Sequence, residues 1–210
     1  MIVSFSYATI KLYELYRGGY RTMTKVFFDF EFTGLHQNTT PISLGMVSDK
    51  KELYCEFTDY DKSQVDEWID KQVIQNLMLK DVAEDERFIK EIGSMTVVRG
   101  DREFVKKAVT EWLSQYKHGV ELWGDTLIYD GVLFNELFGG AFFIPDNVYY
   151  IYFDIATLFK LHGIDPDISR EAFIDHPVSG AKHNALYDAK VTRACYDKLS
   201  RNREEYPVVF

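Results

Sequence analysis

A very apolar segment, residues 26–32, contains two carboxylates one residue apart, and this constrains the fold more than any other stretch. Its sequence, VFFDFEF, predicts a β-strand within a sheet, with Asp29 and Glu31 on one face and Phe28 and Phe30 on the other. Burial of an unpaired carboxylate costs several kcal/mol or forces protonation, and neighbouring carboxylates repel each other. Either the face with the acids is solvated, or a cation neutralises them. Four phenylalanines in the segment leave little room for a wet face.

The segments that follow predict a mixed sheet flanked by helices. Residues 42–47 and 53–57 are apolar and are joined by turn residues, which predicts an antiparallel meander with the first strand. Strand and helix patterns then alternate, as is typical of an α/β domain. Further strands are expected at 119–124 and 149–155, and helices at 63–79, 129–138, 184–202, from the N-cap Asp101 to about residue 116, and before Gly163; residues 80–100 give no clear assignment.

The length and composition fit one folded domain. The chain has 210 residues, of which 46% are hydrophobic, and it shows no repeat or low-complexity linker. We expect residues 1–22 to be an N-terminal extension of unclear role and residues 23–210 to be a single domain. No apolar run is long enough to span a bilayer, and no membrane partner is expected. Cys55 and Cys195 lie far apart without metal-ligand spacing, which favours a reducing, cytoplasmic location.

The charge of the chain limits how it can hold a polyanion. Its formal net charge is −9 and it has no run of Lys or Arg, whereas proteins that grip long nucleic acids are usually basic. Any polyanion must therefore be held locally, at a site where cations offset the acids. Asp29 and Glu31 are hard oxygen ligands of the kind that Mg²⁺ and Mn²⁺ prefer.

A second acidic motif, HNALYDA at residues 183–189, stands at the start of the last expected helix. A spacing of five would turn His183 away from Asp188 on a continuous helix. The two can meet only if His183 lies on the loop before the helix, with Asn184 as the N-cap. Alternatively, Asp188 only favours the positive end of the helix.

A third segment, residues 123–134, delivers an acid at a strand-to-helix junction, where sites of α/β proteins collect their side chains. Either Asp125 or Asp130 can fill this place. For each of them, taken singly, a role as a helix cap is a strong alternative.

In chain order, Asp29-x-Glu31, Asp130 and His183-x₄-Asp188 resemble the motifs of the DEDDh 3′-5′ exonucleases, in the ribonuclease H-like superfamily. The resemblance is greatest to the small bacterial and phage 3′-5′ exoribonuclease branch. FDFEFTGL (28–35) resembles the first family motif, YDGV…LFG (129–139) the second and HNALYDA the third. The position four before Asp188 is Asn184, not tyrosine, which indicates the histidine subclass. The second motif lacks the residue pattern that is common in DNA-proofreading relatives. The choice of Asp130 as its acid therefore rests on the Tyr-Asp match, and Asp125 is the alternative.

The resemblance implies an α/β, ribonuclease H-like mixed sheet and a metal-dependent 3′-5′ exoribonuclease that acts on short, single-stranded or 3′-overhanging RNA. It implies that two divalent cations, Mg²⁺ or Mn²⁺, lie roughly 3.5–4 Å apart. Asp29 would bridge both ions, Glu31 and Asp188 would complete one, and Asp130 would support the other. His183 would take the proton from the attacking water. Asp154 resembles a supporting acid, with a helix cap as the alternative.

Residues after the first strand are candidates for contact with the terminal nucleotide: Thr33, Gly34 through its backbone, and Leu35 as an apolar wedge. Phe32, Trp123 and Tyr129 are candidates for stacking, although aromatic residues are more often part of a core. The same chemistry on DNA is an alternative, because no motif reads the 2′-hydroxyl. A non-catalytic nucleic-acid-binding module is another. Relatives are often homodimers, but the sequence shows no interface signature.

Overall fold

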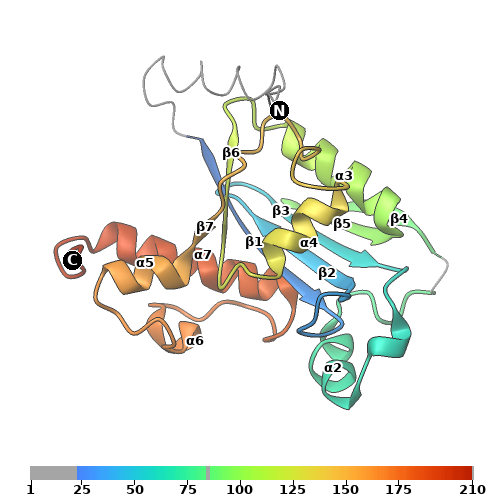
Figure 1. Ribbon diagram of the computed structural model, residues 1–210, viewed down its shortest axis with the longest axis horizontal. Coiled ribbons are helices and arrows are strands. Elements are labelled where there is room, and N and C mark those ends of the chain that lie inside the picture. Colours follow the sequence, from blue (N-terminus) through green and yellow to red (C-terminus); the bar gives the residue numbers. More distant parts are fainter. Residues whose placement is uncertain (1–22, 84–85, 210) are drawn as a thin grey trace, which may run out of the picture.

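A mixed β-sheet forms the centre of the protein (Figure 1). The computed structural model describes residues 23–83 and 86–209, and the expected extension, residues 1–22, lies outside this part. The sheet order is β4-β5-β3-β2-β1-β6-β7. Its strands are β1 (Thr24–Phe32), β2 (Pro41–Val47), β3 (Glu52–Phe57), β4 (Phe88–Ile92), β5 (Met95–Gly100), β6 (Val120–Gly124) and β7 (Phe153–Asp154). The first three form the predicted antiparallel meander, and β6 runs parallel to β1, which confirms the predicted α/β class.

Helices cover both faces of the sheet (Figure 1). They are α2 (Glu67–Gln72), α3 (Arg102–Ser114), α4 (Asp130–Leu137), α5 (Ile155–Leu161), α6 (Arg170–Phe173) and α7 (Ala185–Arg201), with 3₁₀-helices η1 (Lys62–Gln64) and η2 (Ile74–Asn76). Helices α3 and α4 pack on one face and α7 packs on the other, along β1 and β2. None of the helices in the described residues is long and apolar enough to cross a membrane.

The two faces of β1 differ as predicted. Val26, Phe28 and Phe30 are buried in the main core with α3 and α4. Phe27 instead faces α7, where its ring lies 5.4 Å from that of Tyr196. Full burial of one phenylalanine stabilises a fold by about 1.5–3 kcal/mol, so the buried face anchors the strand firmly. The acids therefore stand on a rigid support, on the face covered by α7.

A glycine in β2 lets α7 come close to the acids. Gly45 pairs with Asp29 across the sheet, and a Cβ atom at position 45 would lie 2.3 Å from the carbonyl oxygen of Ala185. Glycine in a strand interior often marks such a close approach of another backbone. The first turn of α7 therefore lies directly over the strand pair that carries Asp29.

The structure corrects two of the predicted elements. The helix expected at 63–79 is broken into η1, α2 and η2, because Val65 and Asp66 are extended and the Asp66 side chain caps α2 at the Ile69 amide. The strand expected at 149–155 is reduced to the two residues of β7. Tyr152 leaves the ladder, packs against Phe28 and donates its hydroxyl to Asn135 Oδ1 at 2.6 Å.

Residues 80–100, which gave no assignment, contain the hairpin of β4 and β5. Its turn passes through Gly93, whose φ of 62° is the conformation that glycine adopts most readily. Two predicted N-caps are confirmed: Asp101 accepts the amide of Phe104, and Asn184 accepts the amide of Leu186 in α7.

Candidate active site

Asp29 and Glu31 form the floor of the site on β1. Both are partly buried. Burial raises the pKa of Asp29 well above its usual range, and the charges of Asp130, Glu31 and Asp188 raise it further. Burial, followed by the charge of Asp188, raises the pKa of Glu31 to about 8. The structure thus brings the four acids of the three motifs into one electrostatic cluster.

Asp130 reaches this cluster from the first turn of α4. Strand β6 pairs with β1 only as far as Phe27, so the edge of β1 beyond that residue lacks a strand partner on this side. Oδ1 of Asp130 accepts the backbone amide of Phe30 there, at 2.8 Å. The side chain is buried, and burial raises its pKa to about 7 although the hydrogen bond from Phe30 favours the charged form.

Asp125, the alternative acid of this motif, is held by an arginine. Nε and Nη2 of Arg170 donate to its two carboxylate oxygens at 2.7 and 2.9 Å. Both carboxylate oxygens of Asp154 also accept hydrogen bonds. Oδ1 accepts the Thr157 amide and so caps α5, and Oδ2 accepts the Leu127 amide at 3.1 Å. Both aspartates therefore anchor the loop that leads from β6 to Asp130.

His183 and Asp188 meet in the way that their spacing requires. Asp188 lies in the first turn of α7, and His183 lies on the preceding loop with a φ of 61°. The backbone amide of His183 donates to Oδ2 of Asp188 at 2.8 Å. Burial raises the pKa of Asp188 to about 7, while the amide of His183 acts in the opposite direction.

The side chains of this cluster fit a divalent cation. In the part of the chain that the structure describes, Glu31, His183 and Asp188 each place one ligand atom within 4.8 Å of the others. Carboxylates that are gathered together and partly buried are stabilised in their ionised form by a hard cation, and oxygen ligands suit Mg²⁺ and Mn²⁺. Burial and the charge of Lys182 lower the pKa of His183, so its imidazole is neutral near pH 7 and free to accept a proton.

The residues predicted to contact substrate fall into two groups. Leu35 is 78% exposed just beyond β1, and the Phe32 and Tyr129 rings stack on each other at 5.3 Å. These three lie beside the acids in the chain. Gly34 is partly exposed between them, and a Cβ atom there would lie 2.9 Å from the His36 ring.

Thr33 does not present its side chain to a ligand, and Trp123 packs among other aromatic residues, which was the alternative for it. The Thr33 side chain is buried, donates to Gln64 and accepts the Thr40 amide at 2.8 Å, so it fastens the loop and is not exposed to a ligand. Trp123 packs in an aromatic cluster, with its ring 4.9 Å from that of Phe153 and 4.8 Å from that of Tyr196. Neither side chain belongs to the exposed surface beside the acids.

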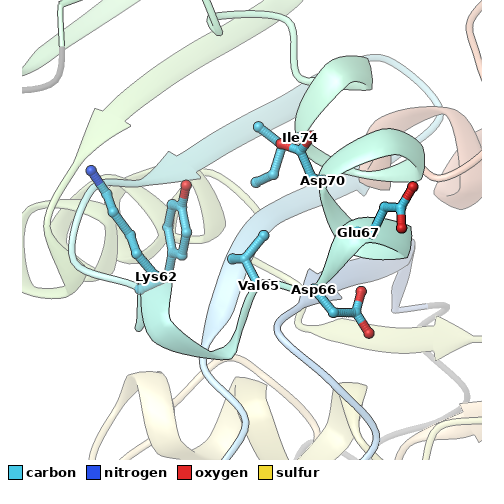
Figure 2. A pocket seen from close by; sticks show the side chains of 7 residues that line it. Lys62, Val65, Asp66, Glu67, Asp70 and Ile74 are labelled. Atoms are coloured by element: carbon cyan, nitrogen blue, oxygen red, sulfur yellow. The ribbon is translucent and has the colours of Figure 1, made fainter.

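Sequence reasoning missed the segment around α2. Trp68 contacts the His183 ring at a centroid distance of 5.1 Å, and Asn76 is hydrogen-bonded to both neighbours of His183. Trp68 lies within the helix expected at 63–79, and no sequence pattern linked it to His183. A hollow of about 410 Å³ beside α2 is lined by Tyr60, Lys62, Val65, Asp66, Glu67, Asp70 and Ile74 (Figure 2). No residue of the three motifs lines it, so it is separate from the acid cluster.

Comparison with known proteins places this geometry in a family. No curated protein matches the chain. Among solved structures, Pop2p of S. pombe in its Mg²⁺- and Mn²⁺-bound form matches with a TM-score of 0.54 and 16% identity over 96% of this chain and 90% of that one. This likeness confirms the ribonuclease H-like fold. The 3′-5′ exoribonuclease Rv2179c-like domain matches residues 24–199, which include all three motifs, and the chain therefore belongs to this family, a DEDD-type 3′-5′ exonuclease as predicted.

Proposed function

We propose that the chain removes nucleotides stepwise from the 3′ end of short or single-stranded RNA, by metal-dependent hydrolysis at the acid cluster. The observation that carries the proposal is the convergence of Glu31, His183 and Asp188 within 4.8 Å, in an exoribonuclease family. A site with a purely structural role has no reason to gather carboxylates at such electrostatic cost.

Asp29, Glu31, Asp130 and Asp188 would hold two Mg²⁺ or Mn²⁺ ions. Support comes from the raised pKa values of all four carboxyl groups, because burial and neighbouring charges make their ionised forms costly without a compensating cation. The solved structure of Pop2p in a form with both metals is consistent with this choice of ions for the fold. When bound, the cations supply Lewis-acid chemistry that activates water and stabilises the leaving 3′-oxygen.

His183 is the proposed general base. Its neutral imidazole accepts the proton of a water whose oxygen attacks the terminal phosphorus, while the bond from phosphorus to the 3′-oxygen breaks. The products are a nucleoside 5′-monophosphate and an RNA shortened by one residue. The contact between the His183 amide and Asp188 keeps the base beside the acids.

The exposed surface beside the cluster suits an unpaired strand. Leu35 offers an apolar contact to a base, and the stacked pair of Phe32 and Tyr129 lies at the end of β1. Bases of a single strand are accessible to such contacts, whereas bases in a duplex are stacked on each other. The backbone at Gly34, between these side chains, is proposed to approach the terminal nucleotide.

One assay tests the proposal. Purified protein with Mn²⁺ or Mg²⁺ is given 5′-labelled RNA and DNA oligonucleotides, single-stranded and with 3′ overhangs, and the products are resolved by length. We expect a ladder that shortens from the 3′ end of RNA, and no ladder from Asp29→Ala or Asp188→Ala. Degradation of DNA in preference to RNA would overturn the substrate, and no degradation of either would overturn the enzyme. Light scattering of the same sample tests whether the chain forms a homodimer.

A further inference from the structure

A segment outside the three motifs, residues 67–76, contacts the His183 ring through Trp68 and the two chain neighbours of His183 through Asn76. We infer that Asn76 and Trp68 of this segment are positioning residues, which hold the His183 imidazole where it can take the proton from water. The inference rests on the proposed function, because it assigns a position to the base of that reaction. It adds to the acid motifs a second structural element that the reaction needs.

Asn76 fixes the backbone on both sides of His183. Its side-chain Nδ2 donates to the carbonyl of Lys182 at 3.0 Å. Its own carbonyl accepts the side-chain amide of Asn184 at 2.9 Å, and Asn184 also caps α7. One residue of η2 is therefore bonded to the residue before the histidine and to the residue after it.

The histidine needs such support because of its backbone conformation. A φ of 61° is uncommon for residues other than glycine, and it persists only where the surroundings determine it. In this conformation the His183 amide points to Oδ2 of Asp188. Release of the Lys182 carbonyl would allow the loop to relax toward ordinary dihedral angles, and the ring would then move away from the acids.

Trp68 supports the ring itself. Its indole meets the imidazole edge-to-face, with an interplanar angle of 70° and a centroid distance of 5.1 Å. Helix α2 is anchored from its other side, because Ile69 and Val73 are buried against Ile42 of β2. Trp68 remains 55% exposed, so burial in a core does not account for a tryptophan at this position. Edge-to-face contacts of aromatic rings fix relative orientation as well as distance.

Two substitutions separate the two contacts. Asn76→Ala removes the bond to Lys182 and a local bond to the Gln72 carbonyl, but keeps the carbonyl that holds Asn184. Trp68→Ala removes the ring contact, and Trp68→Phe keeps an aromatic edge. Gln75→Ala is the matched control, because Gln75 is an exposed neighbour in the same 3₁₀-helix.

A displacement of about 1 Å at a reacting group lowers rates by up to about 100-fold, so we expect kcat to fall about 10- to 100-fold in the two alanine variants. KM and Mn²⁺ affinity should stay within about threefold, and Trp68→Phe should recover most of the loss.

Nuclear magnetic resonance of the histidine rings supplies a readout that does not depend on turnover. The chain has five histidines, and the His183 signal is assigned by its loss in His183→Asn. In the metal-free protein, Trp68→Ala should shift this signal through loss of the indole ring current, and Asn76→Ala should broaden or shift it. Gln75→Ala should leave it unchanged. Unchanged kcat and unchanged His183 signals in the folded alanine variants would overturn the inference. An inactive wild-type protein would instead overturn the proposed function, and the ring signals would still decide whether the segment positions His183.

Discussion

The backbone amide of Phe30 donates a 2.8 Å hydrogen bond to Oδ1 of Asp130, one hundred residues further along the chain. This bond joins the first acidic motif to the second at the edge of β1 that β6 leaves without a strand partner. One carboxylate therefore performs two tasks, since it completes the hydrogen bonding of the strand and adds its charge to that of Asp29.

The two tasks of Asp130 can be separated. Asp130→Asn keeps an acceptor for the Phe30 amide but removes the charge, so the variant should fold normally and lose activity about 100-fold or more, since even outer-shell partners of metals contribute 10- to 100-fold. Asp130→Ala removes the acceptor as well, and an unpaired buried amide costs about 1–3 kcal/mol. Unfolding in urea should show that difference between the two variants. Equal stabilities would argue against the bond, and an active Asp130→Asn would argue against a ligand role.

The contribution of local and distant interactions explains which features were predictable. The alternation of side chains between the two faces of β1 follows from a spacing of two residues, and the loop position of His183 follows from its spacing of five from Asp188. Both depend only on residues that are close in sequence. The bond from Phe30 to Asp130 and the placement of Trp123 depend on packing between elements far apart in sequence. The prediction of a full strand at 149–155 was wrong for the same reason: contacts of Tyr152 with the distant core residue Phe28 outweighed the β propensity of the segment.

Stability of the metal-free protein should fall as pH rises. Unfolded aspartate and glutamate titrate near about 4, whereas the folded values are about 7 for Asp130 and Asp188 and about 8 for Glu31. Between these values the folded state binds more protons than the unfolded state, so the free energy of unfolding decreases with pH. The melting temperature should therefore fall from pH 5 to pH 8, and Glu31→Gln should make this slope shallower.

Bound metal should restore the stability that the metal-free protein loses at high pH. Binding to the folded state alone contributes about 2.7 kcal/mol at a metal concentration 100 times Kd. Because the ligands must lose their protons first, Mn²⁺ should raise the melting temperature at pH 8 and have a much smaller effect at pH 5.5. An equal shift at both pH values would show that the metal binds elsewhere than at these four acids.

Gly45→Ala should damage the site through α7. The added Cβ would meet the carbonyl of Ala185 at 2.3 Å, so the helix must move away from β2 and carry Asp188 with it. Overpacking of this kind costs about 1–3 kcal/mol. We expect lower thermal stability together with weaker Mn²⁺ binding by calorimetry. Ser43→Ala, in the same strand, adds no atoms and serves as the control, and normal metal affinity in a folded Gly45→Ala protein would contradict the expected coupling.

Asp125→Asn should affect stability more than metal binding. The ion pair with Arg170 is largely buried, with side chains 22% and 15% exposed, and the arginine would lose a charged partner. Because both groups keep some contact with solvent, we expect a loss of roughly 1–3 kcal/mol, less than for a fully buried pair. Mn²⁺ affinity should remain within a few fold of the wild type. A folded Asp125→Asn protein that no longer binds Mn²⁺ would instead make Asp125 the acid of the second motif.

Leu35→Ala should weaken substrate binding without a change in the fold. The side chain is 78% exposed, and surface substitutions usually alter stability by less than about 0.5 kcal/mol. Loss of an apolar contact with a terminal base should raise KM for a short RNA by about 10-fold while kcat changes little, since the removed contact is made before and during the reaction alike. Ile89→Ala, at an exposed apolar residue of the outer strand β4, is the matched control. Equal KM values for the two variants would show that Leu35 does not contact the RNA, and the surface at the end of β1 would then have to be assigned to Phe32 and Tyr129 alone.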